Sequence, residues 1–288
     1  MTVYPFVIKI PFCLGIPGVF CIREVTGFGL MMMAAFVMAG WAIQMELRRR
    51  GLREDYAADI VVGAVIGGLV GAKLWYVALT GEGLFSRGGF VWYGGFLGGV
   101  AGVLATGWLK QVPVRLTVEI CAAPLMLGHA LGRVGCFLVQ DDYGVPSSVP
   151  WAIKFPEGLP PTTVASLSQA GVSFPPGTPP DLVVAVHPTQ IYETVLMVIA
   201  FVWLWSRRGH AHGTGWLFGW YLVLAGAERF LVEFLRVKDD RLLGPFTLAQ
   251  ATSLGLVLVG IYLLRRWRDK EAGSHQPSAL ASPARADG

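Results

Sequence analysis

The chain has 288 residues, of which 54% are hydrophobic and only 15% are charged, and its mean hydropathy is +0.56. This composition lies outside the range of ordinary soluble domains and indicates a membrane protein. The formal net charge of +4 does not predict nucleic-acid binding, because the basic residues form short runs beside apolar segments, as in loops that set membrane orientation.

Seven apolar segments are long enough to cross a bilayer as helices, which takes about 20 residues each. They cover about residues 27–47, 57–79, 90–109, 117–139, 188–206, 214–235 and 246–264. The expected fold is therefore an all-α polytopic membrane protein with seven transmembrane helices. Glycines recur every four residues in the second and third segments, which predicts close helix packing there: Gly63, Gly67, Gly71, Gly94, Gly98 and Gly102.

The distribution of Lys and Arg predicts the orientation of these helices. Up to Lys270, twelve basic residues fall in the loops and tail on one side and seven on the other, so the richer side is expected to be the cytoplasm. Residues 1–26 are then an exoplasmic segment, and the polar tail 265–288 is cytoplasmic and disordered. The sequence thus predicts a multi-pass membrane protein with its amino terminus outside.

A proline-rich stretch separates the fourth and fifth expected helices. Residues 140–186 hold nine prolines, too many for a membrane span. Trp151 to Phe155 alternates like a short strand, and Thr162 to Ala170 has the length of two helical turns. We expect a small exoplasmic head here.

Several polar side chains are expected at one depth, in the outer half of the membrane, where ionisable residues usually mark a functional site. Arg229, Glu233 and Arg236 share one helical face by their spacing. A buried arginine needs a carboxylate or a bound anion. Two arginines at one depth suit the phosphate of a phospholipid headgroup, and an internal ion-pair network is the alternative. The set is Lys73, Tyr93, Arg133, His187, Tyr192, Glu193, Arg229, Glu233, Arg236 and Gln250.

Five sequence blocks together resemble bacterial prolipoprotein diacylglyceryl transferases, in the order of that family. GRVGCFLVQDDYG (Gly132 to Gly144) resembles the signature GRxGNFxNxExxG. VWYGGFLGG resembles the HGG block, and PWAIKFP resembles an exoplasmic strand. HPTQIYE (His187 to Glu193) resembles HPxQxYE, and RFLVEFLR (Arg229 to Arg236) resembles RFxxExxR.

The resemblance implies transfer of the diacylglyceryl group of phosphatidylglycerol to the lipobox cysteine of a prolipoprotein, with release of glycerol 1-phosphate. It also implies that this reaction takes place at the outer face of a bacterial cytoplasmic (inner) membrane. The implied partners are phosphatidylglycerol, prolipoprotein signal peptides and membrane lipid, with no nucleic acid. By this analogy Arg133, Arg229, Tyr93 and Glu233 are catalytic. The substrate-binding set is Arg133, Cys136, Asp141, Gly144, His187, Tyr192, Glu193, Arg236 and Gln250.

The chain departs from the family pattern at several positions. Tyr93 stands where the family has a histidine, Cys136 and Val139 replace asparagines, and Asp141 takes the acidic position. Tyrosine is a weak base near neutral pH, since its ordinary pKa is about 10. A catalytically silent or retasked phospholipid-binding protein is therefore the alternative. A transporter fits less well, because no internal repeat is visible.

The sequence predicts neither a metal nor another cofactor. Its four cysteines, Cys13, Cys21, Cys121 and Cys136, show no spacing of a zinc or redox motif. The nucleophile of the implied reaction belongs to the substrate, so the enzyme needs no catalytic cysteine of its own.

Overall fold

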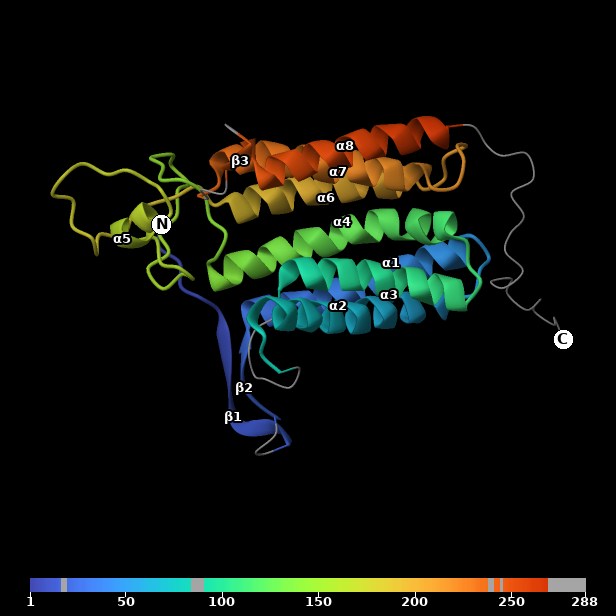
Figure 1. Cartoon of the computed structure of the whole chain (residues 1–288), viewed down its shortest axis with the longest axis horizontal. Coiled ribbons are helices and arrows are strands. Elements are labelled where there is room, and N and C mark those ends of the chain that lie inside the picture. Colours follow the sequence, from blue (N-terminus) through green and yellow to red (C-terminus); the bar gives the residue numbers. More distant parts are fainter. Residues whose placement is uncertain (17–19, 84–90, 238–240, 244–245, 269–288) are drawn as a thin grey trace. The chain divides into compact units, whose positions relative to one another are not determined.

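Helices form most of the chain in the computed structural model, which describes residues 1–16, 20–83, 91–237, 241–243 and 246–268 (Figure 1). Seven long helices and one short helix occur in this part. They are α1 (Gly27–Arg49), α2 (Tyr56–Thr80), α3 (Trp92–Leu109), α4 (Val114–Val139), α5 (Val164–Gln169), α6 (Thr189–Arg207), α7 (Trp216–Val232) and α8 (Leu248–Arg266).

Length and hydropathy identify the helices that could cross a membrane. Five of the described helices, α1, α2, α4, α6 and α8, are long and apolar enough to do so. The apolar helix α3 has 18 residues and α7 has 17. This confirms an all-helical polytopic membrane protein. The expected segments and the observed helices differ by only a few residues at most ends.

Two of the expected segments are not helical along their whole predicted length. The segment 214–235 forms a regular helix only to Val232, and Glu233–Leu235 continues as a 3-10 turn. The segment 246–264 begins with strand β4 (Phe246–Thr247), which pairs with β3 (Arg241–Leu243), before α8 starts. Of the expected tail 265–288, residues 269–288 lie outside the described part.

The amino-terminal segment contains a β-hairpin that the sequence had not predicted. Strands β1 (Val7–Ile16) and β2 (Phe20–Thr26) pair antiparallel, with Val7 opposite Thr26 (Figure 1). The register shifts between Lys9 and Leu14, the stretch that holds Pro11. Prolines in strands are typically found at such irregularities because they cannot donate a ladder hydrogen bond.

The chain divides into two units that cut across the helices. The first contains Met1–Ala35, Leu125–Gly209 and Gly219–Arg265, and the second contains Phe36–Pro124, His210–Phe218 and Arg266–Gly288. The division inside α4 follows Pro124, whose ring removes a helical hydrogen bond.

In the second unit, α2 and α3 pack backbone against backbone (Figure 1). A Cβ atom at Gly67 would overlap the carbonyl oxygen of Gly98, and one at Gly98 would overlap the carbonyl oxygen of Gly67. The glycines therefore serve the close helix approach that their spacing predicted.

A buried carboxylate, Glu119 of α4, organises polar contacts in the same unit. It accepts hydrogen bonds from the backbone N–H groups of Gly215 (2.9 Å) and Leu217 (3.1 Å), at the start of α7. It also contacts His210 at 2.6 Å and Arg50 at 3.3 Å. A carboxylate at a helix N-terminus satisfies free backbone donors, so this cluster has a structural explanation.

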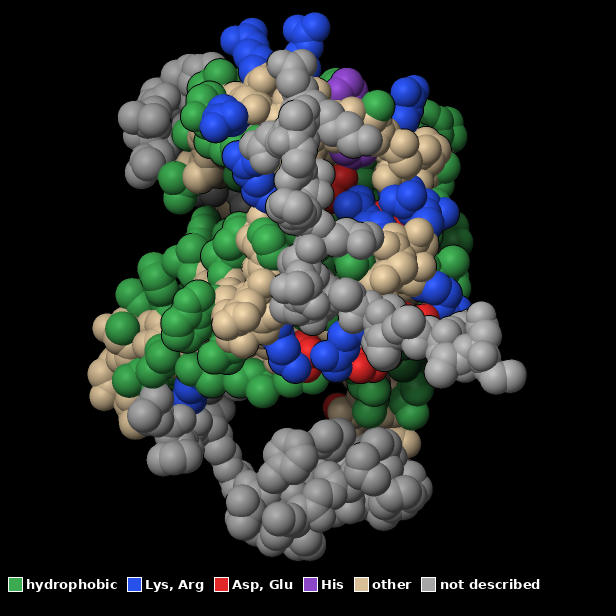
Figure 2. Space-filling model, turned by 90° about the vertical axis from the view of Figure 1, so that its right-hand side faces the viewer, with side chains coloured by type: hydrophobic (Ala, Val, Ile, Leu, Met, Phe, Trp, Pro, Cys, Tyr) green, Lys and Arg blue, Asp and Glu red, His purple; other side chains and the backbone are tan. Residues whose placement is uncertain are grey.

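Basic side chains are present at the ends of several helices. Figure 2 shows a face on which Lys and Arg side chains lie among hydrophobic ones. The last turns of α1 and α6 contain Arg48, Arg49 and Arg207. This is the pattern on which the predicted orientation depends.

The head between α4 and α6 has its own small core in the first unit. Tyr143, Phe155 and Leu167 are buried in it, and Ile153 pairs with Val186. Within the expected helical piece, α5 covers Val164–Gln169, and the Thr163 side chain caps it by accepting from the Ser166 N–H. The head is therefore a folded element.

Candidate functional site

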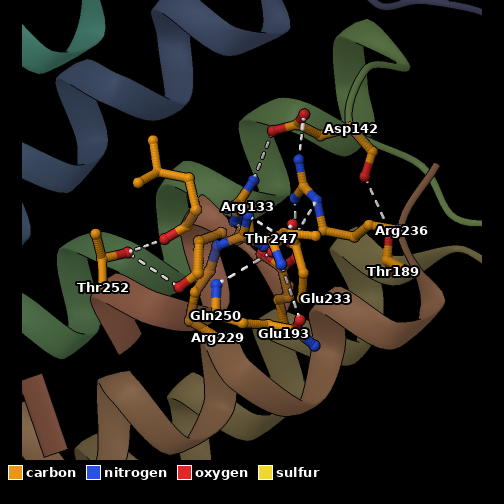
Figure 3. Close-up of polar contacts among 12 residues, drawn as sticks. Arg133, Asp142, Thr189, Glu193, Arg229, Glu233, Arg236, Thr247, Gln250 and Thr252 are labelled. Carbon is orange, nitrogen blue, oxygen red and sulfur yellow. Dashed lines mark hydrogen bonds and ion pairs between the residues drawn. The ribbon is translucent and has the colours of Figure 1, made fainter. Parts of the chain in front are cut away.

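The site is an arginine and carboxylate cluster in the first unit (Figure 3). Glu193 of α6 lies at its centre and is only 1% exposed. Its Oε1 accepts from Nη1 of Arg236 at 3.2 Å, and its Oε2 is ion-paired with Nε of Arg133. One buried carboxylate thus joins α4, α6 and the end of α7.

Asp142 links the same two arginines from the start of the head. Its Oδ2 accepts from Nη1 of Arg133 at 2.9 Å, and its Oδ1 accepts from Nη2 of Arg236 at 2.5 Å (Figure 3). Its neighbour Asp141 is the acid that the sequence block predicted, and the role of Asp141 in substrate binding remains a prediction. Both acids stand in the same block, and spacing alone did not tell which one reaches the arginines.

Arg229 and Glu233 form the second half of the cluster. Nη2 of Arg229 lies 2.6 Å from Oε2 of Glu233, one turn further along the chain. The other oxygen of Glu233 accepts from the Thr247 hydroxyl at 3.1 Å. Sequence spacing had predicted the shared face of Arg229, Glu233 and Arg236, and Nε of Arg236 lies 3.7 Å from Oε2 of Glu233.

Gln250 acts in the start of α8. Its Oε1 accepts from the Thr247 N–H at 3.2 Å, while the Thr247 hydroxyl accepts from the Gln250 N–H at 3.1 Å. This reciprocal pair is a capping box, which satisfies two free backbone donors of the helix. Gln250 therefore positions Thr247, the residue that contacts Glu233.

Two side chains at the start of α6 hydrogen-bond to the backbone of the segment that contains Asp142. The Thr189 hydroxyl donates to the carbonyl of Asp142 at 2.8 Å, and Nε2 of Gln190 donates to the carbonyl of Asp141 at 2.5 Å. Asp142 has a φ of +56°, a left-handed backbone conformation that residues other than glycine adopt rarely. Side chains from α6 therefore stabilise the backbone turn that aims Asp142 at the arginines.

Gly144 allows the head to approach α6 and the end of α7. Its N–H donates to the carbonyl of His187 at 2.9 Å. A Cβ atom here would lie 2.5 Å from the carbonyl oxygen of Leu235 and 2.8 Å from Cγ2 of Thr189. Gly144 thus has a packing role close to the cluster.

His187 and Tyr192 form a separate polar chain beside the cluster. Nε1 of Trp151 donates to the Tyr192 hydroxyl at 2.6 Å, and that oxygen lies 3.1 Å from Nδ1 of His187. Trp151 is 59% exposed. These hydrogen bonds link the head to the start of α6, the helix that also carries Glu193.

Cys136 and the two aspartates lie close enough together to hold a metal ion, since one ligand atom from each falls within 4.8 Å of the others. Asp142 already contacts two guanidinium groups, and Nη1 of Arg133 lies 3.7 Å from Sγ of Cys136. Burial raises the pKa of the Asp141 carboxyl, and the neighbouring Asp142 raises it further. Because Asp142 is already paired with two arginines, we assign no metal ion to these three residues.

The glycines near Arg133 in α4 differ in their surroundings. A Cβ atom at Gly128 or Gly132 would meet none of the described atoms within 4 Å, whereas one at Gly135 would lie 3.1 Å from the Phe28 ring of α1. Gly135 thus serves helix packing, and the Gly128 and Gly132 face leaves room beside Arg133.

Tyr93 lies in the first turn of α3, in the second unit, and is 52% exposed. The other predicted catalytic and substrate-binding residues belong to the first unit, whereas Lys73 of α2 belongs to the second. The part of Tyr93 in the site therefore remains a prediction.

The paired groups balance in charge. Three arginines (Arg133, Arg229 and Arg236) are in contact with three carboxylates (Asp142, Glu193 and Glu233). Guanidinium groups bind phosphate or carboxylate through paired, directional hydrogen bonds. The fold and site thus define a helical membrane protein with a buried arginine cluster suited to an anionic group.

Comparison with known proteins narrows this class. The family of prolipoprotein diacylglyceryl transferases matches residues 17–266. The chain belongs to this family. A phosphatidylglycerol–prolipoprotein diacylglyceryl transferase of Geobacter sulfurreducens is 30% identical over 254 residues, which cover 83% of this chain and 89% of that protein.

Two further relatives carry the same name. The protein of Clostridium tetani is 26% identical over 249 residues, covering 83% of this chain and 92% of its own length. That of Nitratidesulfovibrio vulgaris, strain Hildenborough, is 30% identical over 260 residues, covering 84% and 90%. The resemblance found in the sequence blocks is therefore confirmed at the level of the family.

Proposed function

We propose that this protein transfers the diacylglyceryl group of phosphatidylglycerol to the lipobox cysteine of prolipoproteins and releases glycerol 1-phosphate. The observation that carries the proposal is the cluster of Arg133, Arg229 and Arg236 in a chain of this family. Three guanidinium groups in a buried, charge-balanced site can bind a phosphodiester and stabilise the charge that develops when the phosphate leaves.

Arg133 and Arg229 have different roles at the phosphate: Arg133 binds the headgroup, and Arg229 stabilises the leaving group. Arg133 lies next to the open Gly132 face of α4, so it is the arginine that a lipid headgroup entering there would meet. Arg229 keeps one side of its guanidinium paired with Glu233, and it stabilises the leaving glycerol phosphate with the other. Glu193, Asp142 and Glu233 hold the arginines in place.

The remaining predicted residues shape the site around this centre. Cys136 and Asp141 lie beside Arg133, Gly144 lets the head come close, and His187 with Tyr192 connects the head to α6. Arg236 holds Asp142 and Glu193 together, and Gln250 caps α8. Tyr93 hydrogen-bonds the headgroup or ester in this proposal.

We place the protein in the bacterial cytoplasmic membrane, with seven transmembrane helices. Residues 1–26 and the head 140–186 face outward, and the tail 265–288 faces the cytoplasm. The loop distribution of Lys and Arg supports this orientation. The active site then opens to the outer leaflet, where the lipobox of a translocated prolipoprotein arrives.

A direct test joins complementation with a purified assay. Expression in cells depleted of their own transferase is expected to restore growth and lipoprotein maturation. The purified protein is expected to convert a lipobox peptide and phosphatidylglycerol into a thioether-linked product, and a peptide with serine in place of cysteine serves as control. Phosphatidylglycerol binding without product in either assay would favour a silent phospholipid-binding protein.

A further inference from the structure

Glu228 of α7 is a buried acid that takes part in none of the described ion pairs. It is 8% exposed, and among the described residues neither carboxyl oxygen has a hydrogen-bond partner. The other buried acids of this region, Glu193 and Glu233, each contact an arginine. A buried carboxyl group without a partner is costly to keep, so its position calls for an explanation.

The position of Glu228 relates it to the site. It precedes Arg229 in α7, and it interacts electrostatically with Glu193, Arg133, Arg229 and Arg236. Nη1 of Arg229 is also buried and lacks a hydrogen-bond partner among the described residues. Two unsatisfied polar groups on adjacent residues thus border the arginine cluster.

The charge balance of the cluster indicates the form in which Glu228 rests. The three arginines are already paired with Asp142, Glu193 and Glu233, so among the described ion pairs no further guanidinium charge compensates an ionised Glu228. A bound phosphodiester would add another negative charge. Glu228 therefore carries a proton when the site receives its anion, because an uncompensated buried charge is strongly unfavourable.

We propose that Glu228 is the proton-transfer residue of the reaction, an inference that rests on the proposed function. The bond that breaks joins the glyceryl carbon to a phosphate oxygen, and the bond that forms joins that carbon to the cysteine sulfur. The carboxyl proton of Glu228 passes to the departing phosphate oxygen. The carboxylate then takes up the proton that the substrate thiol loses, so Glu228 is unchanged after one turnover.

This assignment gives the reaction a proton path that does not need a histidine at position 93. General acid catalysis by a positioned carboxyl group typically contributes roughly 10²- to 10⁴-fold to a rate. Glu228 interacts electrostatically with the guanidinium groups of Arg133 and Arg229, so the proposal places the acid and both arginines at the same phosphate.

The test uses Glu228→Gln in the full-length protein in lipid nanodiscs. Glutamine keeps the shape and can donate a hydrogen bond, but it cannot release a proton. We expect kcat to fall by roughly 10²-fold or more, while the KM for phosphatidylglycerol and the melting temperature stay near the native values. Glu157→Gln, which removes an exposed carboxylate of the head, is the matched control and is expected to leave kcat unchanged.

The outcomes separate this inference from the proposed function. An inactive native protein would contradict the function itself. An active native protein with near-native kcat in Glu228→Gln would overturn the role of Glu228 and leave the function intact. Should the Gln variant fail to fold, Glu228→Met keeps a similar volume and removes both the proton and the unpaired buried polar group. A lower kcat at unchanged KM in that variant supports proton transfer, and native kcat contradicts it.

Discussion

Arg229 and Glu233, four residues apart, are joined through one nitrogen only: Nη2 of the arginine lies 2.6 Å from Oε2 of the glutamate. Nη1 of Arg229 is buried and has no hydrogen-bond partner among the described residues. One side of the guanidinium thus orients the group, and the other is available to an anion. A planar guanidinium can do both at once, whereas a single ammonium group cannot.

Replacement of either phosphate-binding arginine by lysine is therefore expected to impair the reaction. Arg133→Lys and Arg229→Lys keep the charge and lose the paired geometry. The expected loss in kcat/KM is about 1.5–3 kcal/mol, the typical value for a hydrogen bond to a charged group. Turnover of phosphatidylglycerol with a lipobox peptide measures it, and Arg207→Lys at the end of α6 is the control. Native turnover in both variants would leave only a structural ion-pair network.

Asp142→Asn is expected to destabilise the site, because one carboxylate contacts both Arg133 and Arg236. Breaking a fully buried pair costs about 3–5 kcal/mol. The Asp142 side chain is 31% exposed, so about 1–3 kcal/mol is expected after allowance for solvent screening. Thermal unfolding in detergent measures the change. Asp181→Asn, an exposed head residue, is the control, and equal melting temperatures for the two variants would contradict the role of Asp142.

The α2 and α3 contact predicts a sharp difference between neighbouring glycines. Gly67→Ala places a methyl group against the Gly98 carbonyl, whereas a Cβ atom at Gly68 would meet its nearest atom, the Gly95 carbonyl oxygen, at 3.5 Å. We expect Gly67→Ala to lower stability by about 1–3 kcal/mol through overpacking and Gly68→Ala to have little effect. Unfolding of both variants under one set of conditions decides the point, and equal stabilities would refute the close backbone packing.

The membrane orientation is testable by cysteine labelling. Ser168 lies in α5 of the head, and Ser206 lies near the end of α6. A membrane-impermeant thiol reagent is expected to label Ser168→Cys in intact spheroplasts and Ser206→Cys only after the membrane is opened. The native chain measures the background from its own cysteines. The reverse pattern would invert the orientation and move the active site to the inner leaflet.

Tyr93 decides between an active enzyme and a silent relative. If Tyr93 hydrogen-bonds the headgroup or ester, Tyr93→Phe should lower kcat/KM by the worth of one hydrogen bond, about 0.5–1.5 kcal/mol. The native protein should be active, because the arginines supply the positive field and Glu228 supplies the proton path. Absence of product from the native protein, together with clear product from Tyr93→His, would show that a histidine is indispensable.

The helices and most of the cluster could be predicted from the sequence because they depend on local patterns. The apolar segments located the helices to within a few residues, and the spacing of Arg229, Glu233 and Arg236 placed them on one face. Chemistry alone required carboxylate or anion partners for Arg133 and Arg229. These inferences needed no knowledge of which segments meet.

What the sequence could not predict depends on contacts between distant segments. Asp142 rather than Asp141 reaches the arginines because Thr189 and Gln190 fix the turn that follows α4. Gln250 acts as a helix cap, which its partner Thr247 could have indicated through the Thr-x-x-Gln spacing. Glu228 was not among the predicted site residues, because its lack of a hydrogen-bond partner depends on contacts that the sequence does not show. The hairpin of β1 and β2 is interrupted by proline and gave no clear strand alternation.

The internal pairing of the arginines has a consequence for selectivity among phosphates. At Arg133, whose guanidinium contacts both Asp142 and Glu193, a dissolved phosphate ion must displace a carboxylate that the fold holds in place at an effective concentration of roughly millimolar or higher. A phospholipid competes on better terms, because its acyl chains confine the headgroup to the plane of the membrane. We therefore expect soluble glycerol phosphates to inhibit weakly, and the released product to leave readily once the tether to the bilayer is cut. The carboxylates that hold the arginines in place thus also favour anchored anions over free ones.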